Sequence, residues 1–138
     1  MKAKGLLFIL AALLCLTGIT ASAAEENWID FAQEVPLTDE AGNPSSSGKY
    51  YLISTPEQLA WIAQQVNTGA GGNTMLNATI RLCNDIDLSG KEWTPIGNGS
   101  YYFSSKFDGN GKIIQNITIS QLQNGVTNYG LFGIVTGQ

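Results

Sequence analysis

A short acidic segment is the part of this sequence with the clearest potential for chemistry. Asp85, Asp87 and Ser89 place side-chain oxygens at alternate positions before Gly90, as in the first half of a calcium-binding loop. The position where such a loop needs its bidentate Glu is occupied by Ile96. We therefore expect Asp85 and Asp87 to be outward-facing residues of a strand, and we predict no metal and no cofactor.

Carboxylates could also act in pairs, as they do in glycosidases, with one as acid and the other as base or nucleophile. Such an enzyme needs carboxylates that converge in one groove. The sequence contains no His, which excludes Ser-His and Cys-His dyads and His-ligated zinc. Cys83 lies among apolar residues, as a buried small hydrophobe does. We expect no catalytic residue and retain a carbohydrate-active enzyme, a polysaccharide lyase or glycosidase, as the alternative. The candidate carboxylates are Asp85, Asp87, Glu92 and Asp108.

Three aromatic residues are candidates for contact with a ligand. Tyr101 and Tyr102 follow a polar Asn-Gly-Ser segment, and Trp93 lies shortly before it. Aromatic rings with a polar end, placed next to amides, can form a platform for a sugar. The predicted partner is therefore a glycan or a host surface protein, and the alternative is that these rings only pack.

The N-terminus has the three-part layout of a secretory signal peptide. Lys2 and Lys4 provide the basic start, an apolar run follows, and small residues precede Ala23. The apolar run is shorter than the roughly 20 residues that span a bilayer. We predict a signal peptide over residues 1–23, a secreted or cell-surface location, and no membrane span after cleavage.

The charge balance narrows the possible partners. The net charge is −4, and removal of the two N-terminal lysines makes it more negative. Nucleic acids are bound through clusters of Lys and Arg, which this sequence lacks. We therefore predict no nucleic-acid partner. Cys83 is the only cysteine beyond the signal peptide, so no intramolecular disulfide can form.

Three predicted segments come before the candidate residues in the chain. They are a linker over residues 24–48, a strand over residues 50–53 and a helix over residues 56–67. Thr55 is a helix N-cap, and Pro56 suits the first helical position. The helix has one apolar face, formed by Leu59, Ile62, Ala63 and Val66.

An internal repeat follows the helix. A single shift along the sequence places Leu82 on Ile113, Ile86 on Ile117 and Leu88 on Ile119, so that apolar positions coincide. The alternation around these positions predicts strands with one buried face. The buried set should be Leu82, Ile86, Leu88, Ile113, Ile117 and Ile119, with Asp85, Asp87 and Thr118 facing solvent. Asp108-Gly109-Asn110-Gly111 is typical of a tight turn.

The same segments, in the same order, resemble bacterial GLUG-motif proteins. The residues that carry the resemblance are Tyr51-Leu52-Ile53-Ser54-Thr55, Asn84-Asp85-Ile86-Asp87-Leu88-Ser89-Gly90, Trp93-Thr94-Pro95-Ile96-Gly97, Phe107-Asp108-Gly109-Asn110-Gly111, Ile117-Thr118-Ile119 and Gly130-Leu131-Phe132-Gly133.

This resemblance implies a mainly β fold, a right-handed parallel β-helix, in which residues 49–138 form a capping α-helix and the first coils of the solenoid. It also implies an exported, adhesin-like binding or structural module at the cell surface. The chain is expected to be a truncated part of a longer protein whose further β-helix repeats cover Leu131 and Phe132. Without those repeats, we expect these residues to promote self-association.

Overall fold

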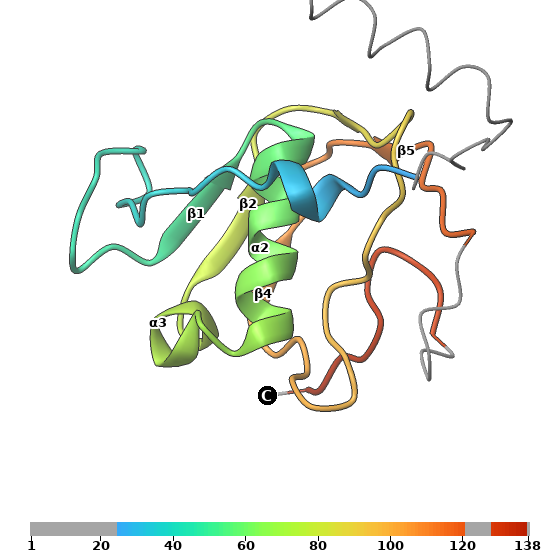
Figure 1. Cartoon of the computed structure of the whole chain (residues 1–138). Coiled ribbons are helices and arrows are strands. Elements are labelled where there is room, and N and C mark those ends of the chain that lie inside the picture. Colours follow the sequence, from blue (N-terminus) through green and yellow to red (C-terminus); the bar gives the residue numbers. More distant parts are fainter. Residues whose placement is uncertain (1–24, 121–127, 138) are drawn as a thin grey trace, which may run out of the picture.

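The computed structural model describes residues 25–120 and 128–137 (Figure 1). The predicted signal peptide lies outside the described residues, as does the first residue of the predicted linker. No helix in the described part is both long enough and apolar enough to cross a membrane.

A three-stranded parallel sheet contains β1 (Tyr50–Ile53), β2 (Thr79–Leu82) and β4 (Lys106–Asp108), in the order β1-β2-β4. Tyr51, Ile80 and Phe107 lie side by side across it. In β1 and β2 every second residue is buried, which gives the sheet one core-facing side. The predicted strand over residues 50–53 is confirmed.

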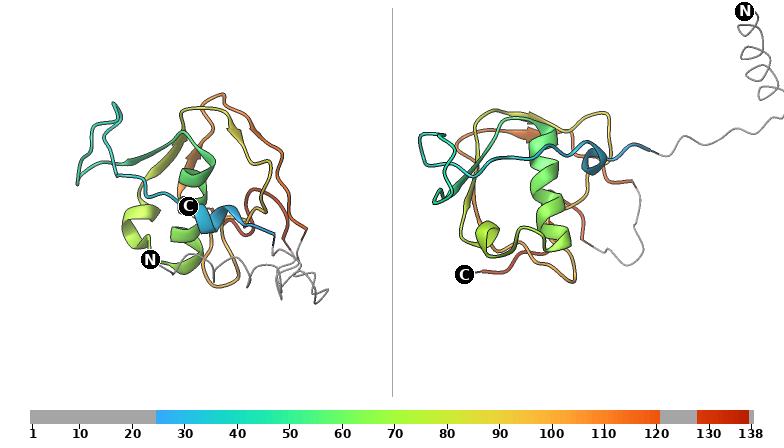
Figure 2. Two further views of the ribbon diagram at one scale, coloured as in Figure 1. Left: turned by 45° about the horizontal axis from the view of Figure 1, so that its top comes forward. Right: turned by 60° about the vertical axis from the view of Figure 1, so that its left-hand side comes forward.

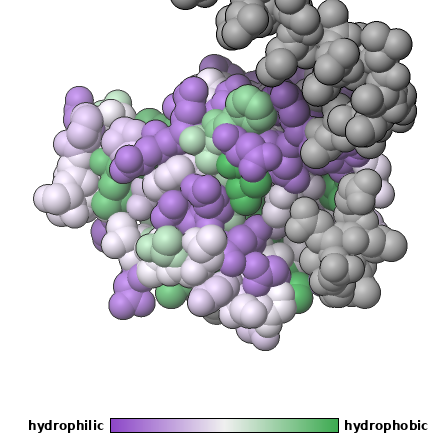
Figure 3. Space-filling model, viewed as in Figure 1, coloured by the Kyte–Doolittle hydropathy of each residue, from purple (hydrophilic) through white to green (hydrophobic). Residues whose placement is uncertain are grey.

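Helix α2 (Pro56–Thr68) connects β1 to β2 together with the short helix α3 (Gly72–Leu76). The side chain of Thr55 accepts a hydrogen bond from the Gln58 N–H, which confirms the predicted N-cap. Leu59 and Ile62 of α2 are fully buried in the same core as the strands. Figures 1 and 2 show α2 running alongside the sheet, and the surface on this side is mainly hydrophilic (Figure 3).

A second parallel sheet contains two very short strands, β3 (Ile86–Asp87) and β5 (Ile114–Gln115). Ile86 lies opposite Ile114. The internal repeat predicted that Ile86 would correspond to Ile117, so the predicted register is wrong by an odd number of residues. Because side chains alternate between the two faces of a strand, an odd slip moves every side chain to the opposite face.

The slip explains why Ile113 and Ile117 are exposed, but it does not explain the positions of Thr118 and Ile119, which come after Asn116 with its positive φ of 59°. Leu82, Ile86 and Leu88 are buried as predicted, and Asp85, Asp87 and Thr118 face solvent as predicted. Ile113 is 59% exposed and Ile117 is also exposed, whereas Ile114 packs against the core. Ile119 is only partly buried.

The predicted fold class, a right-handed parallel β-helix, is wrong. The described residues form two small parallel sheets of three and two strands, and neither sheet closes or continues as a solenoid. The pairing between successive segments is parallel, but the strands contain two to four residues each. Strands this short bury too little apolar surface to form a stable core by themselves. Residues of α2 and of the surrounding loops therefore complete the core.

The predicted turn after β4 is confirmed. Asn110 and Gly111 both have positive φ, at 48° and 66°. The carboxylate of Asp108 accepts a hydrogen bond from the Asn110 N–H at 2.9 Å, as Asp does at the start of such turns. The Asn110 side chain donates to the Leu82 carbonyl at 3.0 Å, so it also fastens the turn to β2.

The segment from Gly130 to Val135 packs back onto the loop after Trp93. Ile96 pairs with Phe132 in a parallel bridge, and the Phe132 ring lies 4.8 Å from that of Phe103. Leu131 and Phe132 are therefore partly buried against the core. The prediction that the apolar side chains of this segment lack a partner within the chain is therefore wrong for Leu131 and Phe132, whereas Val135, which belongs to the same predicted set, is 56% exposed. Figure 2 shows this last segment beside the loop.

Cys83 is half-buried with a free thiol and is not the fully buried core residue that we predicted.

Candidate binding site

The loop that follows β3 is fastened to the C-terminal end of α2 by Asn67. The Nδ2 of Asn67 donates to the carbonyl of Pro95 at 2.9 Å. The Oδ1 of the same side chain accepts from the N–H of Gly97 at 2.7 Å. Both ends of one amide are used, so this part of the loop has a defined position relative to the helix.

Asn98 continues this attachment. Its Nδ2 donates to the Asn67 carbonyl at 2.9 Å, and its Oδ1 accepts from the N–H groups of Ser100 and Tyr101, both at 2.9 Å. One Asn therefore satisfies a carbonyl at the end of α2 and shapes the turn that presents Tyr101.

Tyr101 lies against the residue that ends α2. Gly69 caps the helix in the left-handed conformation with φ 73°. A Cβ atom at this position would lie 2.4 Å from the Tyr101 ring. Glycine is required here by both its backbone angle and the close contact. Part of the Tyr101 ring is packed on the helix end, and the side chain is still 47% exposed.

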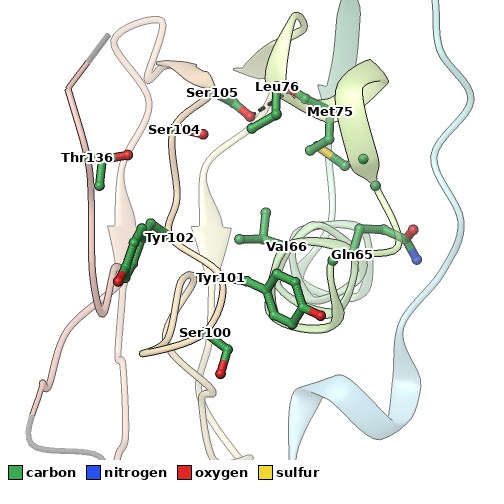
Figure 4. A pocket seen from close by; sticks show the side chains of 13 residues that line it. Gln65, Val66, Met75, Leu76, Ser100, Tyr101, Tyr102, Ser104, Ser105 and Thr136 are labelled. Carbon is green, nitrogen blue, oxygen red and sulfur yellow. Dashed lines mark hydrogen bonds between the residues drawn. The ribbon is translucent and has the colours of Figure 1, made fainter.

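A cavity of about 260 Å³ lies between the end of α2, α3 and residues 100–105 (Figure 4). The residues that line it come from three separate parts of the chain, and none of them carries a charge. They are Gln65, Val66, Gly69, Gly71, Gly72, Met75, Leu76, Ser100, Tyr101, Tyr102, Ser104, Ser105 and Thr136.

The two tyrosines occupy different walls of this cavity. Figure 4 shows Tyr102 on one side, with Thr136 above it, and Val66 and Tyr101 on the other. The Ser105 hydroxyl donates to the Met75 carbonyl at 2.7 Å. This bond joins the residue just before β4 to α3, at the top of Figure 4. The walls of the cavity therefore carry both apolar side chains and hydroxyl groups.

Of the three aromatic residues predicted to contact a ligand, two line the cavity. Tyr101 and Tyr102 are 47% and 49% exposed. Trp93 is only 2% exposed, and its indole N–H donates to the Leu131 carbonyl at 3.2 Å. The prediction that Trp93 contacts a ligand is therefore wrong, because its ring is in the core and its polar atom is already bonded.

The sequence reasoning missed the remaining lining residues. Gln65 and Met75 belong to helices, and Thr136 belongs to the segment after Phe132. They come together only through packing, and no local pattern marks them. The one local feature of the sequence that points to this site is Gly69, because a glycine there indicates where α2 ends and the chain changes direction.

The candidate acidic residues do not gather in this cavity. Asp85 accepts a hydrogen bond from the Ile113 N–H at 2.9 Å. Asp87 accepts from the Asn116 amide at 2.9 Å and from the Ser89 N–H at 3.0 Å. Both carboxylates thus fasten neighbouring segments to the turn around β3.

Asp108 is similarly occupied. It pairs with Arg81 on the adjacent strand at 2.7 Å, and Arg81 also reaches Glu40 at 3.4 Å. In the described ranges, no three His, Cys, Asp or Glu side chains lie close enough together to hold a metal ion.

A close pair of carboxylates involves Glu25, a residue that we did not predict. The Ser120 hydroxyl lies 2.7 Å from Glu25 and also bonds to Glu92, whose second oxygen accepts from the Ser120 N–H at 2.7 Å. An open hollow of about 380 Å³ borders this pair. The position between the two carboxylates, where a glycosidic oxygen would have to lie, is taken by the hydroxyl. Glu25 and Ser120 are so distant in sequence that only the fold reveals this arrangement.

Hydrogen bonds lower the pKa of three of these carboxyl groups. The Asn116 side chain and then the Ser89 N–H lower the pKa of Asp87, and the Arg81 guanidinium lowers that of Asp108. The Ser120 hydroxyl lowers the pKa of Glu92.

This hydrogen bonding predicts how stability depends on pH. A carboxyl whose pKa is lower in the folded chain favours folding while ionised, and this contribution is lost as the pH falls through the lowered value. We therefore expect the urea midpoint to be constant above about pH 5 and to fall below about pH 4, where unperturbed carboxyls titrate. Asp87→Asn should reduce the fall, and Asp30→Asn serves as the charge-matched control. A midpoint at pH 3 equal to that at pH 7 would contradict the expectation.

A scan against models of protein families finds no match to this chain, and searches of curated proteins and of solved structures find none either.

Proposed function

We propose that this chain is an exported binding module that contacts a glycan at the cell surface through the cavity at the end of α2. The observation that carries the proposal is the pairing of two half-exposed tyrosines, Tyr101 and Tyr102, with hydroxyl-bearing neighbours around one cavity. Tyrosine offers a large, rigid surface with one polar end, which suits a partner that is partly apolar and partly hydroxylated.

The export part of the proposal is supported by residues 1–23, whose composition is that of a signal peptide. The resemblance to GLUG-motif proteins is part of the same proposal and favours adhesion over catalysis. The alternative, a carbohydrate-active enzyme, has less support because Asp85, Asp87 and Asp108 each accept hydrogen bonds from neighbouring segments of the chain. The Glu25 and Glu92 pair encloses a serine hydroxyl.

Substitution of Tyr102 tests the proposal. On a glycan array, we expect Tyr102→Ala to lower binding about tenfold, the scale seen when an aromatic contact at the centre of an interface is truncated. Tyr129→Ala is the matched control, because Tyr129 is similarly exposed, at 54% against 49% for Tyr102, and does not line the cavity. Thermal unfolding of each variant should match that of the wild type, since both side chains are half in solvent.

Two results would overturn the proposal. One is that the wild-type chain binds no glycan on the array. The other is that Tyr129→Ala lowers binding as much as Tyr102→Ala, which would place the contact outside the cavity. Capture of a host surface protein by the wild type, with no glycan bound, would replace the glycan by a protein partner.

A further inference from the structure

The chemistry of the cavity lining restricts which glycan could bind, if the proposed function holds. None of the 13 lining residues carries a charge, although the described part of the chain contains many acidic groups elsewhere. An ionised group that enters such a site loses water and gains no partner of opposite charge, which is strongly unfavourable. The lining therefore selects against acidic sugars and against sugars that carry a free, protonated amine.

The end of α2 does not supply a compensating field for a cation. The carbonyls at a helix C-terminus carry a partial negative charge that attracts positive groups when they are free. Here the carbonyl of Gln65 accepts from Gly71, that of Val66 accepts from Gly69, and that of Asn67 accepts from Asn98. These carbonyls are already hydrogen-bonded within the chain, so the helix end offers little to a cationic ligand.

The polar groups that remain are suited to hydroxyls. The Ser105 hydroxyl uses its proton on the Met75 carbonyl, so its oxygen can still accept a bond from a ligand hydroxyl. Thr136 presents its hydroxyl beside Tyr102 (Figure 4). Leu76, which is 40% exposed, and the Tyr102 ring offer apolar surface of the kind that the C–H face of a pyranose ring can cover, whereas Val66 and Met75 lie almost wholly buried beneath.

The size of the cavity sets a further limit. Its volume of about 260 Å³ falls just below the range of about 300–1,000 Å³ that is usual for sites of drug-sized ligands. The packed contact between Tyr101 and Gly69 closes one end. A space of this volume favours one sugar ring over a run of several.

We infer that the ligand of this cavity is a single neutral pyranose ring, such as the uncharged terminal residue of a glycan, bound between Tyr102 and the end of α2. The uncharged lining, the hydroxyl acceptors and the small volume all favour this class over acidic sugars and over internal segments of a polysaccharide.

Ligand-observed NMR on the purified chain tests this inference with methyl glycosides of glucose, galactose and mannose, and with glucuronate and sialate as acidic probes. We expect saturation transfer to at least one neutral glycoside and at least a tenfold weaker response from both acids. A trisaccharide ending in the same neutral sugar should bind no more than a few times more tightly than the monosaccharide.

A charge introduced at the rim provides a gain-of-function variant. Thr136→Lys should bring the response of glucuronate up to that of the neutral glycoside, whereas Thr136→Gln, the neutral control, should not. The Thr136 backbone N–H bonds to the Phe103 carbonyl and is unaffected by either change.

The possible outcomes distinguish a failure of this inference from a failure of the proposed glycan binding. If acidic sugars bind the wild type as well as neutral ones do, or if only long oligosaccharides bind, this inference is wrong while glycan binding itself stands. If no sugar produces a response and the array is also blank, the proposed function fails and the inference fails with it. If Thr136→Lys and Thr136→Gln behave alike toward glucuronate, Thr136 does not border the bound sugar and the inferred location is wrong.

Discussion

Ile86→Ala should lower the free energy of unfolding by about 2–5 kcal/mol, the usual cost of truncating a fully buried aliphatic side chain. Ile86 is 1% exposed and lies opposite Ile114 in the small second sheet. Its side chain reaches the shared core, where the neighbouring elements leave little freedom to close the resulting cavity.

Ile113→Ala provides the matched control for this experiment. Ile113 has the same side chain but is 59% exposed, so its truncation should change the free energy of unfolding by no more than about 0.5 kcal/mol. Urea unfolding of both variants measures the difference. Equal losses would mean that Ile113 is buried, as the internal repeat predicts, and that the strand register found here is wrong.

The second large effect is expected at Gly97, where two segments of backbone touch. Gly97 has φ 91°, and a Cβ atom there would lie 2.3 Å from the Ile134 carbonyl oxygen and 2.9 Å from the Phe103 nitrogen. The backbone conformation alone costs a non-glycine residue about 1–3 kcal/mol. The overlap adds to this cost because backbone, and not a flexible side chain, must move.

Gly97→Ala should therefore destabilise the chain by at least about 2 kcal/mol. It should also weaken binding at the cavity, because Thr136 is held by the same segment. Gly99→Ala is the control: a Cβ atom at Gly99 meets nothing within 4 Å, and its φ is not in the left-handed region. Thermal unfolding that shows equal stability for the two variants would contradict the close approach of residues 97 and 134.

Several local features of this protein could be predicted from short stretches of sequence. The helix predicted over residues 56–67 extends from Pro56 to Thr68, one residue further than predicted. It could be placed this closely because a hydroxyl N-cap, a first-turn proline and a glycine C-cap act within the helix itself. The turn after Asp108 was correctly predicted for a similar reason, since Asp, Asn and Gly determine its backbone angles locally.

The pairing between strands depends on residues far apart in the chain and was predicted only in part. The apolar alternation around Ile86 correctly indicated which of its neighbours face inward. The repeat nevertheless aligned Ile86 with Ile117, and the folded chain pairs it with Ile114. Isoleucines at 113, 114, 117 and 119 make several registers look equivalent in sequence. Packing against the rest of the core distinguishes them, because an odd slip reverses the faces.

The candidate site also depends on tertiary structure. Tyr101 and Tyr102 stood out as aromatic residues in a polar loop, but nothing in the sequence indicated that Trp93 is buried while they stay exposed. The cavity exists because Asn67 and Asn98 attach that loop to the end of α2.

Residue types and local caps therefore determined the helix, the turn and the candidate aromatic residues. Only the long-range packing of α2, α3 and the last segment decided which of those residues share a cavity, because burial depends on contacts that no short window of sequence contains.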